Sequence, residues 1–226
     1  MALRWRIAQF FEINWWRQYL KGFEKSRYLD WKTAYWNDFL EKGKLQAPPD
    51  ASVLDAGCGP AGIFTVLKTR EIDALDPLLL SYERSLAHFR QSDYPGVRFF
   101  CLPLERFFPE KQYDVVFCLN AINHVADLPA CADRLAALVK TGGTLALSID
   151  AHRFALLKRL LRLLPVDILH PHQYDVAEYR DMLTRRGFQI ERTVLLKKGR
   201  VFDYYLLVAG KATAFPDSET APSFSL

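Results

Sequence analysis

The chain of 226 residues is poor in cysteine and has no long apolar run. Its four cysteines include no Cys-x-x-Cys pair, which argues against a zinc site. They are instead expected to be small core side chains in a reducing compartment: Cys58, Cys101, Cys118 and Cys131. No stretch of about 18 uncharged apolar residues occurs, so no membrane-spanning helix is expected.

The first residues lack the continuous apolar core of a cleavable signal peptide, because Arg4, Arg6 and Glu12 interrupt them. We therefore expect a cytoplasmic protein. The net charge of +4 is small, and it neither requires nor excludes an anionic partner. A chain of this length is expected to form one domain with elaborations, or one domain with a cap.

Proline is absent from residues 2–45, and glycine is rare there. This favours two or three helices, followed by an extended linker at Pro48 and Pro49. The same segment holds all five tryptophans and many other aromatic residues. These rings either pack a cap of residues 1–50 against the rest of the chain, or line a pocket for an aromatic or long apolar substrate.

A glycine-containing turn follows the first apolar strand. Val53 and Leu54 lead into Asp55, and the turn contains Gly57 and Gly59. A side chain at either glycine would keep a ligand away from the backbone, so a nucleotide-like cofactor is expected here, at the carboxyl end of the strand. The carboxylate of Asp55 would repel a pyrophosphate and favour a cofactor that carries a cationic amino group.

A second strand ends in an acid about 20 residues further on. Residues 71–75 lead into Asp76, whose carboxylate can accept hydrogen bonds from both hydroxyls of a ribose. The turn and the acid together strengthen the prediction of a cofactor that contains a nucleoside.

These segments resemble class I S-adenosylmethionine-dependent methyltransferases over about residues 50–210. The family's first motif is similar to Val-Leu-Asp-Ala-Gly-Cys-Gly-Pro at 53–60, and Asp76 matches its ribose-binding acid. The segments 113–118 and 138–145 resemble the family's fourth strand and the Gly-Gly segment before its fifth. The resemblance implies S-adenosylmethionine as cofactor and a sheet in the order 3-2-1-4-5-7-6, with strand seven antiparallel.

Strand and helix patterns alternate along the chain, which predicts an α/β fold with a doubly wound, Rossmann-like sheet of seven strands after an N-terminal helical cap. The strands are expected at 52–56, 71–75, 97–101, 114–119, 143–149, 188–197 and 201–209. The helices after the cap are expected at 61–69, 78–91, 128–139, 151–164 and 175–186. The methyltransferase domain would then cover 51–210, and the tail 211–226 is expected to be disordered.

The chain departs from the family where the adenine would bind. The family usually places an Asp after strand three, at a point where this chain has Leu102 or Pro103. The adenine would then rely on the N–H of Leu104 and on apolar packing, with Glu105 as a substitute acceptor. Asn120 falls where the family contacts the methionine part of the cofactor.

His124 is the candidate general base, because a histidine suits the removal of a proton from a phenol or hydroxyl near neutral pH. A helix cap or another structural role is the alternative. His170 and His172 are expected to serve structure or bind substrate rather than a metal, since further ligands at suitable spacing are absent.

Residues 153–164 contain four basic residues, no acidic residue, and leucines on one helical face. This pattern predicts a basic amphipathic helix. The helix either packs on the domain, covers the substrate as a lid, or makes a peripheral contact with anionic lipid, and the last two roles suit a lipophilic substrate.

The leading interpretation is therefore methyl transfer to an oxygen of an apolar or aromatic small molecule. A nucleic-acid substrate is disfavoured, because no Asn-Pro-Pro-Tyr or Asp-Pro-Pro-Tyr run follows strand four. A protein substrate and a non-catalytic cofactor-binding module are the remaining alternatives. A nicotinamide-dependent dehydrogenase fits less well because of Asp55. The sequence does not predict the oligomeric state.

Overall fold

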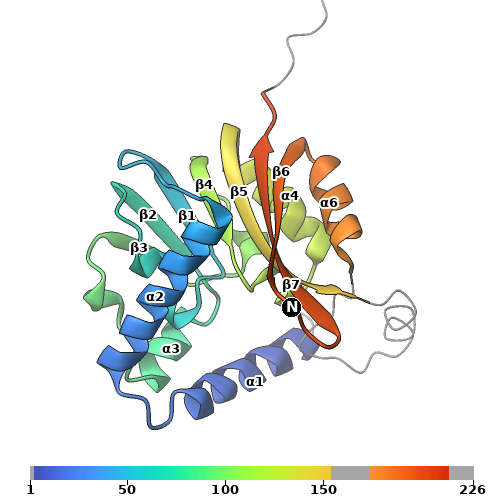
Figure 1. Ribbon diagram of the computed structural model, residues 1–226. Helices are drawn as coiled ribbons and strands as arrows, with labels where there is room; N and C mark the ends of the chain where they lie inside the picture. The colour runs from blue at the N-terminus through green and yellow to red at the C-terminus, as the bar shows by residue number, and fades with distance from the viewer. Residues whose placement is uncertain (1–2, 154–173, 214–226) are drawn as a thin grey trace, which may run out of the picture.

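A sheet of seven strands forms the centre of the molecule, in a computed structural model that describes residues 3–153 and 174–213. The strand order is β3-β2-β1-β4-β5-β7-β6, and β7 runs antiparallel to both of its neighbours (Figure 1). The predicted order and the antiparallel seventh strand are confirmed. The strands are β1 Ser52–Ala56, β2 Glu71–Leu75, β3 Val97–Phe100, β4 Tyr113–Cys118, β5 Val139–His152, β6 Phe188–Lys197 and β7 Phe202–Lys211.

Five α-helices of the described chain surround the sheet: α1 Leu3–Tyr19, α2 Lys25–Gly43, α3 Leu79–Ser85, α4 Leu128–Leu138 and α6 Val176–Thr184. Short 3₁₀ turns lie in the connections between these elements: η1 Gly59–Ala61, η2 Ile63–Thr65, η3 Gln91–Asp93, η4 Leu104–Arg106 and η5 Ile122–His124. Polar caps fix two helix starts. Asp127 accepts the N–H of Ala130 at the start of α4, and Asp175 and Glu178 form a capping box at the start of α6.

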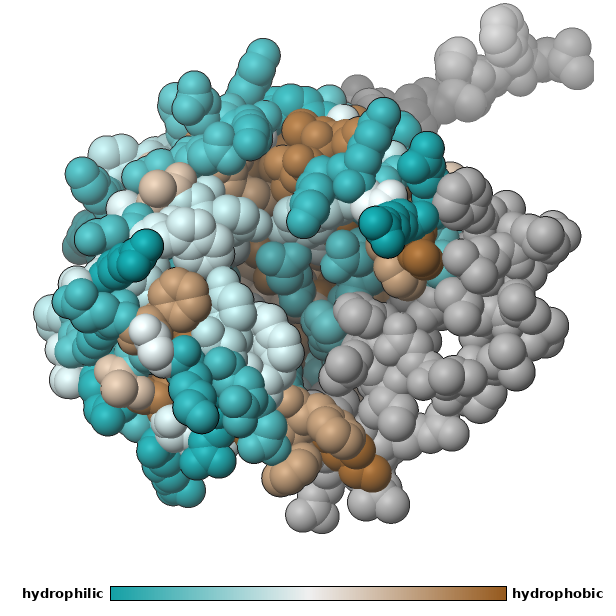
Figure 2. Space-filling view, turned by 60° about the horizontal axis from the view of Figure 1, so that its bottom comes forward, coloured by the Kyte–Doolittle hydropathy of each residue, from teal (hydrophilic) through white to brown (hydrophobic). Residues whose placement is uncertain are grey.

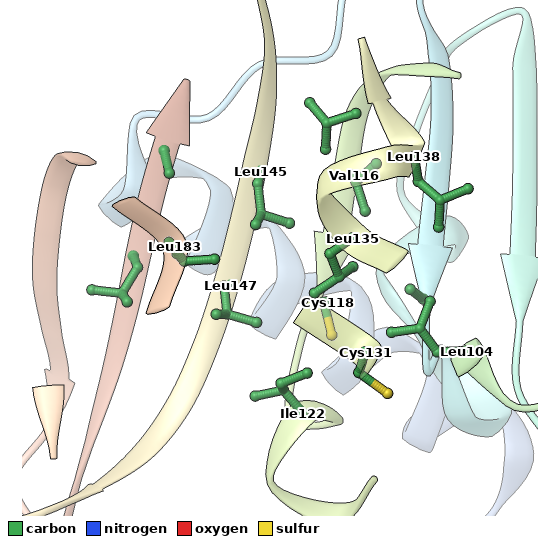
Figure 3. Close-up of a cluster of buried hydrophobic side chains, with 14 of the residues drawn as sticks. Leu104, Val116, Cys118, Ile122, Cys131, Leu135, Leu138, Leu145, Leu147 and Leu183 are labelled. Atoms are coloured by element: carbon green, nitrogen blue, oxygen red, sulfur yellow. The ribbon is translucent and has the colours of Figure 1, made fainter. Parts of the chain in front are cut away.

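The strands alternate their side chains between two buried faces, because successive residues of a strand point to opposite sides. On one face, Leu54 and Val116 join a core with α4 and α6. Figure 3 shows this core, with Leu135 and Leu138 of α4 over the strands β4 and β5. On the other face, Val53 packs with Trp36 and Phe39 of α2.

The aromatic N-terminal segment forms two helices with different positions. Helix α2 lies along one face of the sheet, and α1 crosses below the end of the sheet (Figure 1). Trp36 of α2 is buried, and its indole N–H donates to the carbonyl of Ala61 at 2.9 Å. Trp15 and Trp31 are about half-exposed. Some of the aromatic rings therefore pack in the core, and others, as described below, line a cavity, whose use for a substrate stays a prediction.

The predicted helix at 61–69 is wrong. Two 3₁₀ turns replace it, with an extended residue, Gly62, between them. The buried carboxylate of Asp55 accepts the N–H of Phe64, so this donor is held by a side chain rather than by a helical carbonyl.

Three other expectations need correction. The helix predicted at 78–91 is shorter, since the backbone becomes extended at Leu86. Strand β5 is longer than predicted and continues to His152, which pairs with Phe202, so no helix begins at 151. Cys101 is exposed, whereas the other three cysteines are buried.

Several predictions fall on residues that the structure does not describe. These are the amphipathic helix beyond Arg153, the residues His170 and His172, and the tail from residue 214. Within residues 3–153 and 174–213, no helix combines the length and the apolar character needed to cross a membrane.

Candidate active site

A cavity of about 640 Å³ lies at the carboxyl ends of β1, β2 and β4. The turn after β1, the residues after β2 and β4, and η4 form one part of its lining, and α1 and α2 form the other. Figure 2 views the molecule from this end and shows a hollow near the middle of the face. Carboxyl ends of parallel strands are where open α/β sheets bind ligands.

The glycine turn after β1 is held against the end of β2. The N–H groups of Gly57 and Cys58 both donate to the carbonyl of Leu75, at 2.7 and 3.0 Å. Gly57 and Gly59 have φ values of 77° and 58°, in the left-handed region that favours glycine.

The two glycines differ in what a side chain would meet. A Cβ at Gly57 would lie 2.2 Å from the Cβ of Ala121, so the position is closed by protein packing rather than open to a ligand. At Gly59, the nearest atom would be in the ring of Trp16, at 3.9 Å. Both Gly59 and Trp16 line the cavity. Gly59 is therefore the glycine whose missing side chain leaves room for a ligand.

Asp55 lies behind the turn and is not among the residues that line the cavity. It is 1% exposed, and its Oδ2 accepts the N–H of Phe64 at 3.1 Å. Burial raises the pKa of Asp55 to about 7, although the N–H groups of Phe64 and Ile63 and the charge of Lys32 oppose the rise. The structure gives Asp55 a role in fixing the turn, and its predicted contact with the cofactor stays a prediction.

Asp76 lines the cavity at the end of β2, where the sequence placed it. Its Oδ2 accepts the N–H of Gly59 at 3.0 Å, and its Oδ1 accepts the N–H of Leu78 at 2.8 Å. Burial and the nearby carboxylate of Glu12 raise the pKa of Asp76 to about 7, against the effect of the two N–H donors. A carboxylate accepts more than two hydrogen bonds, so Asp76 keeps acceptor capacity for a bound hydroxyl.

The predicted adenine contacts, Leu104 and Glu105, both line the cavity in η4. The Oε1 of Glu105 accepts the N–H groups of Ala126 and Asp127, at 3.1 and 3.3 Å. This carboxylate therefore holds the loop before α4, and it offers less to an adenine than the sequence predicted.

Asn120 and His124 also line the cavity, after the end of β4. Asn120 has a φ of 54°, a conformation that Asn tolerates, and its N–H donates to Oγ of Ser148 at 2.8 Å. His124 ends η5 and is exposed on the lining of the cavity. The fold thus brings together seven of the eight predicted site residues: Gly57, Gly59, Asp76, Leu104, Glu105, Asn120 and His124.

The sequence prediction missed two charged residues of the cavity, Glu12 of α1 and Lys32 of α2. The hydroxyl of Tyr82 donates to Oε1 of Glu12 at 2.9 Å. Lys32 stands four residues before Trp36, a spacing that places both on one side of a helix. The spacing could have indicated that Lys32 lies on the same side of the helix as Trp36. No sequence pattern, however, linked Glu12 or Lys32 to the ends of the strands.

The lining fits S-adenosylmethionine. At Gly59 a side chain would enter the cavity, so its absence leaves room for a ligand. The carboxyl group of Asp76 lies beside Gly59 and can accept hydrogen bonds from ribose hydroxyls. Apolar residues and aromatic rings complete the walls. Among the described residues, no group of His, Cys, Asp and Glu could hold a metal ion.

Comparison with known proteins defines the class. Residues 25–193 match a family model described as a methyltransferase domain, so the chain belongs to that family. The ubiquinone biosynthesis O-methyltransferase of Rhodopseudomonas palustris (strain BisB5) is 29% identical over 161 residues, which are 67% of this chain and 62% of that protein. The chain thus spans less than two thirds of the length of that relative.

Solved structures share the fold. The 1,6-didemethyltoxoflavin-N1-methyltransferase of Burkholderia thailandensis, with bound S-adenosylhomocysteine, superposes with a TM-score of 0.56 at 16% identity, covering 94% of this chain and 92% of that one. The magnesium protoporphyrin IX methyltransferase of Synechocystis PCC 6803 gives 0.52 at 22% identity, covering 82% and 83%. The predicted methyltransferase family and its Rossmann-like fold are confirmed.

Proposed function

We propose that the chain transfers a methyl group from S-adenosylmethionine to an oxygen of an aromatic or apolar small molecule. The observation that carries the proposal is the aromatic wall of the cavity, which faces the strand ends. Seven aromatic side chains of the two N-terminal helices contribute to it: Phe11, Trp15, Trp16, Tyr19, Trp31, Tyr35 and Trp36. Such rings bind flat or apolar ligands through large contact areas.

Different residues of the cavity would bind different parts of the cofactor and the acceptor. Asp76 would accept hydrogen bonds from the ribose hydroxyls of bound S-adenosylmethionine, and the wall at Leu104 would pack on its adenine. Asn120 would contact the methionine part of the cofactor. S-adenosylmethionine supplies an electrophilic methyl group when bound. The aromatic wall would orient the acceptor, and holding two reactants in line can remove several kcal/mol, about 7–11, from a reaction barrier.

His124 is the proposed general base of the acceptor site. It lines the cavity beside Asn120 and is exposed to it. An imidazole there can take the proton of a hydroxyl as the oxygen gains the methyl group. Oxygen is favoured as the acceptor atom because the curated relative from Rhodopseudomonas palustris is named an O-methyltransferase.

The experiment that tests the proposal identifies the acceptor atom to which the labelled methyl group is transferred. Purified protein is incubated with methyl-labelled S-adenosylmethionine and three matched ring compounds, 2-naphthol, 2-naphthylamine and 2-naphthoate, and with a lipid extract of cells that make the protein. Label on an oxygen, of the hydroxyl or of the carboxylate, supports the proposal. Label on nitrogen alone refutes the oxygen acceptor. Cofactor binding without label on any small molecule refutes the small-molecule acceptor and leaves a macromolecular substrate or a non-catalytic binding module.

A further inference from the structure

Lys32 is a cation inside the aromatic part of the cavity. Its Nζ lies 5.5 Å from the ring centroids of Trp31 and Tyr35 and 5.1 Å from that of Trp36. The side chain is half-buried and lines the cavity. Within residues 3–153 and 174–213, Lys32 has three ring contacts but no ion pair and no hydrogen bond from its side chain.

The surroundings of Lys32 leave its charge poorly compensated. Burial lowers the pKa of Lys32 to about 8, against the attraction of Asp55. Asp55 itself lies behind the turn and makes its hydrogen bond to Phe64. An ammonium group in such a place has lost part of its hydration free energy, and its cation–π contacts with the rings offset only a part of that loss. A ligand with a negative group beside Lys32 would offset the rest of this desolvation free energy.

We propose that Lys32 binds an anionic oxygen group of a small molecule in the cavity, either a carboxylate or an ionised hydroxyl. This deepens the proposed function and rests on it, because the cavity is the one that holds cofactor and acceptor. Two sources can supply the group: the amino-acid carboxylate of the cofactor, or the acceptor. The flanking rings suit an acceptor whose negative group is attached to a ring, since the ring can stack while the group reaches the ammonium.

The cofactor arm compares two ligands by titration calorimetry at pH 7. S-adenosylhomocysteine has the amino-acid carboxylate, whereas 5′-methylthioadenosine has the nucleoside without it. If Lys32 binds the cofactor's carboxylate, Lys32→Met and Lys32→Gln lower the affinity for S-adenosylhomocysteine by about tenfold or more, which is the scale of a charge-assisted hydrogen bond. The affinity of both variants for 5′-methylthioadenosine then stays within twofold of that of wild type. Lys32→Arg keeps the charge and restores most of the affinity.

The acceptor arm uses protein saturated with S-adenosylhomocysteine and two matched probes, 2-naphthoate and the neutral 2-naphthamide. If Lys32 binds the acceptor, wild-type protein prefers the anion by about tenfold, and the preference disappears in Lys32→Met and Lys32→Gln. Lys42→Met is the matched control. Lys42 lies on the same helix, is 53% exposed and pairs with Asp38, so its loss leaves both arms unchanged.

The proposal is overturned if both neutral variants melt within a few degrees of wild type and bind all four probes within twofold of it. Lys32 would then serve only to pack against the rings. Failure of the proposed function looks different, because wild-type protein itself would then transfer no label from S-adenosylmethionine to an oxygen of a small molecule, whatever the Lys32 variants bind.

Discussion

The two glycines of the turn after β1 are expected to respond differently to the same added methyl group. In Gly57→Ala, the new Cβ would lie 2.2 Å from the Cβ of Ala121, at a φ of 77°. Two carbon atoms pack best at about 3.5–4.0 Å, so one of the two loops must move by more than 1 Å. In Gly59→Ala, φ is 58° and the nearest atom is 3.9 Å away, in the ring of Trp16.

The expected magnitudes follow from these two geometries. Overpacking costs about 1–3 kcal/mol and a left-handed non-glycine residue about 1–2 kcal/mol, so Gly57→Ala should lower the free energy of unfolding by about 2–5 kcal/mol. Gly59→Ala carries only the backbone cost and should lower the free energy of unfolding by about 1–2 kcal/mol. Its methyl group enters the cavity, so it should weaken S-adenosylhomocysteine binding more than it weakens the fold.

Urea denaturation measures the first effect, as a lower midpoint at constant slope, and titration calorimetry measures the second. The double variant Gly57→Ala with Ala121→Gly provides the control. It removes the colliding methyl group, so the double variant should be more stable than Gly57→Ala alone. Equal stability of Gly57→Ala and Gly59→Ala, or no recovery in the double variant, would refute the argument from packing.

Three other predictions concern titratable residues of the site. Asp76→Ala should weaken S-adenosylmethionine binding by about 1.5–3 kcal/mol in calorimetry, the scale of charge-assisted hydrogen bonds, and normal affinity would contradict the ribose assignment. His124→Ala should lower turnover about 10²–10⁴-fold at unchanged cofactor affinity, and a loss below tenfold would indicate a structural role. Because the pKa of Asp55 is raised to about 7 in the folded state, the protein binds more protons folded than unfolded between pH 4 and 7. The free energy of unfolding should therefore fall as pH rises through this window, by at most about 4 kcal/mol for this carboxyl, and stay level above it. Urea midpoints at pH 5 to 8 should show a smaller fall in Asp55→Asn, and parallel curves would refute the burial argument.

Local patterns were sufficient for most of the sheet. Strand β1 was predicted with its observed bounds, and so was β2, because short apolar runs between turn residues are typical of buried parallel strands. The same patterns placed Asp76 and Asn120 at strand ends, and the parallel sheet then brought them to one edge. The match to a known family supplied the strand order, which no single segment encodes.

The helix at 61–69 shows where local patterns fail. Its residues are compatible with a helix, but the carboxylate of Asp55 takes the N–H of Phe64 from nine positions away. Gly62 is extended, and a Cβ there would lie 2.3 Å from that carboxylate. The contact between a strand residue and the following turn therefore decided the local backbone, and propensity could not reveal it.

The sequence by itself determined the class of this protein and, through its match to a known family, the order of its strands. Its short motifs also placed Asp76 at the strand end that borders the cavity. The tertiary structure alone decided which glycine is closed and which is open, because Ala121 reaches Gly57 from another strand's loop. It also decided that Glu12 and Lys32 enter the cavity. Both residues belong to helices whose positions depend on how their aromatic faces pack on the sheet and the strand ends, and packing between distant segments leaves no local pattern.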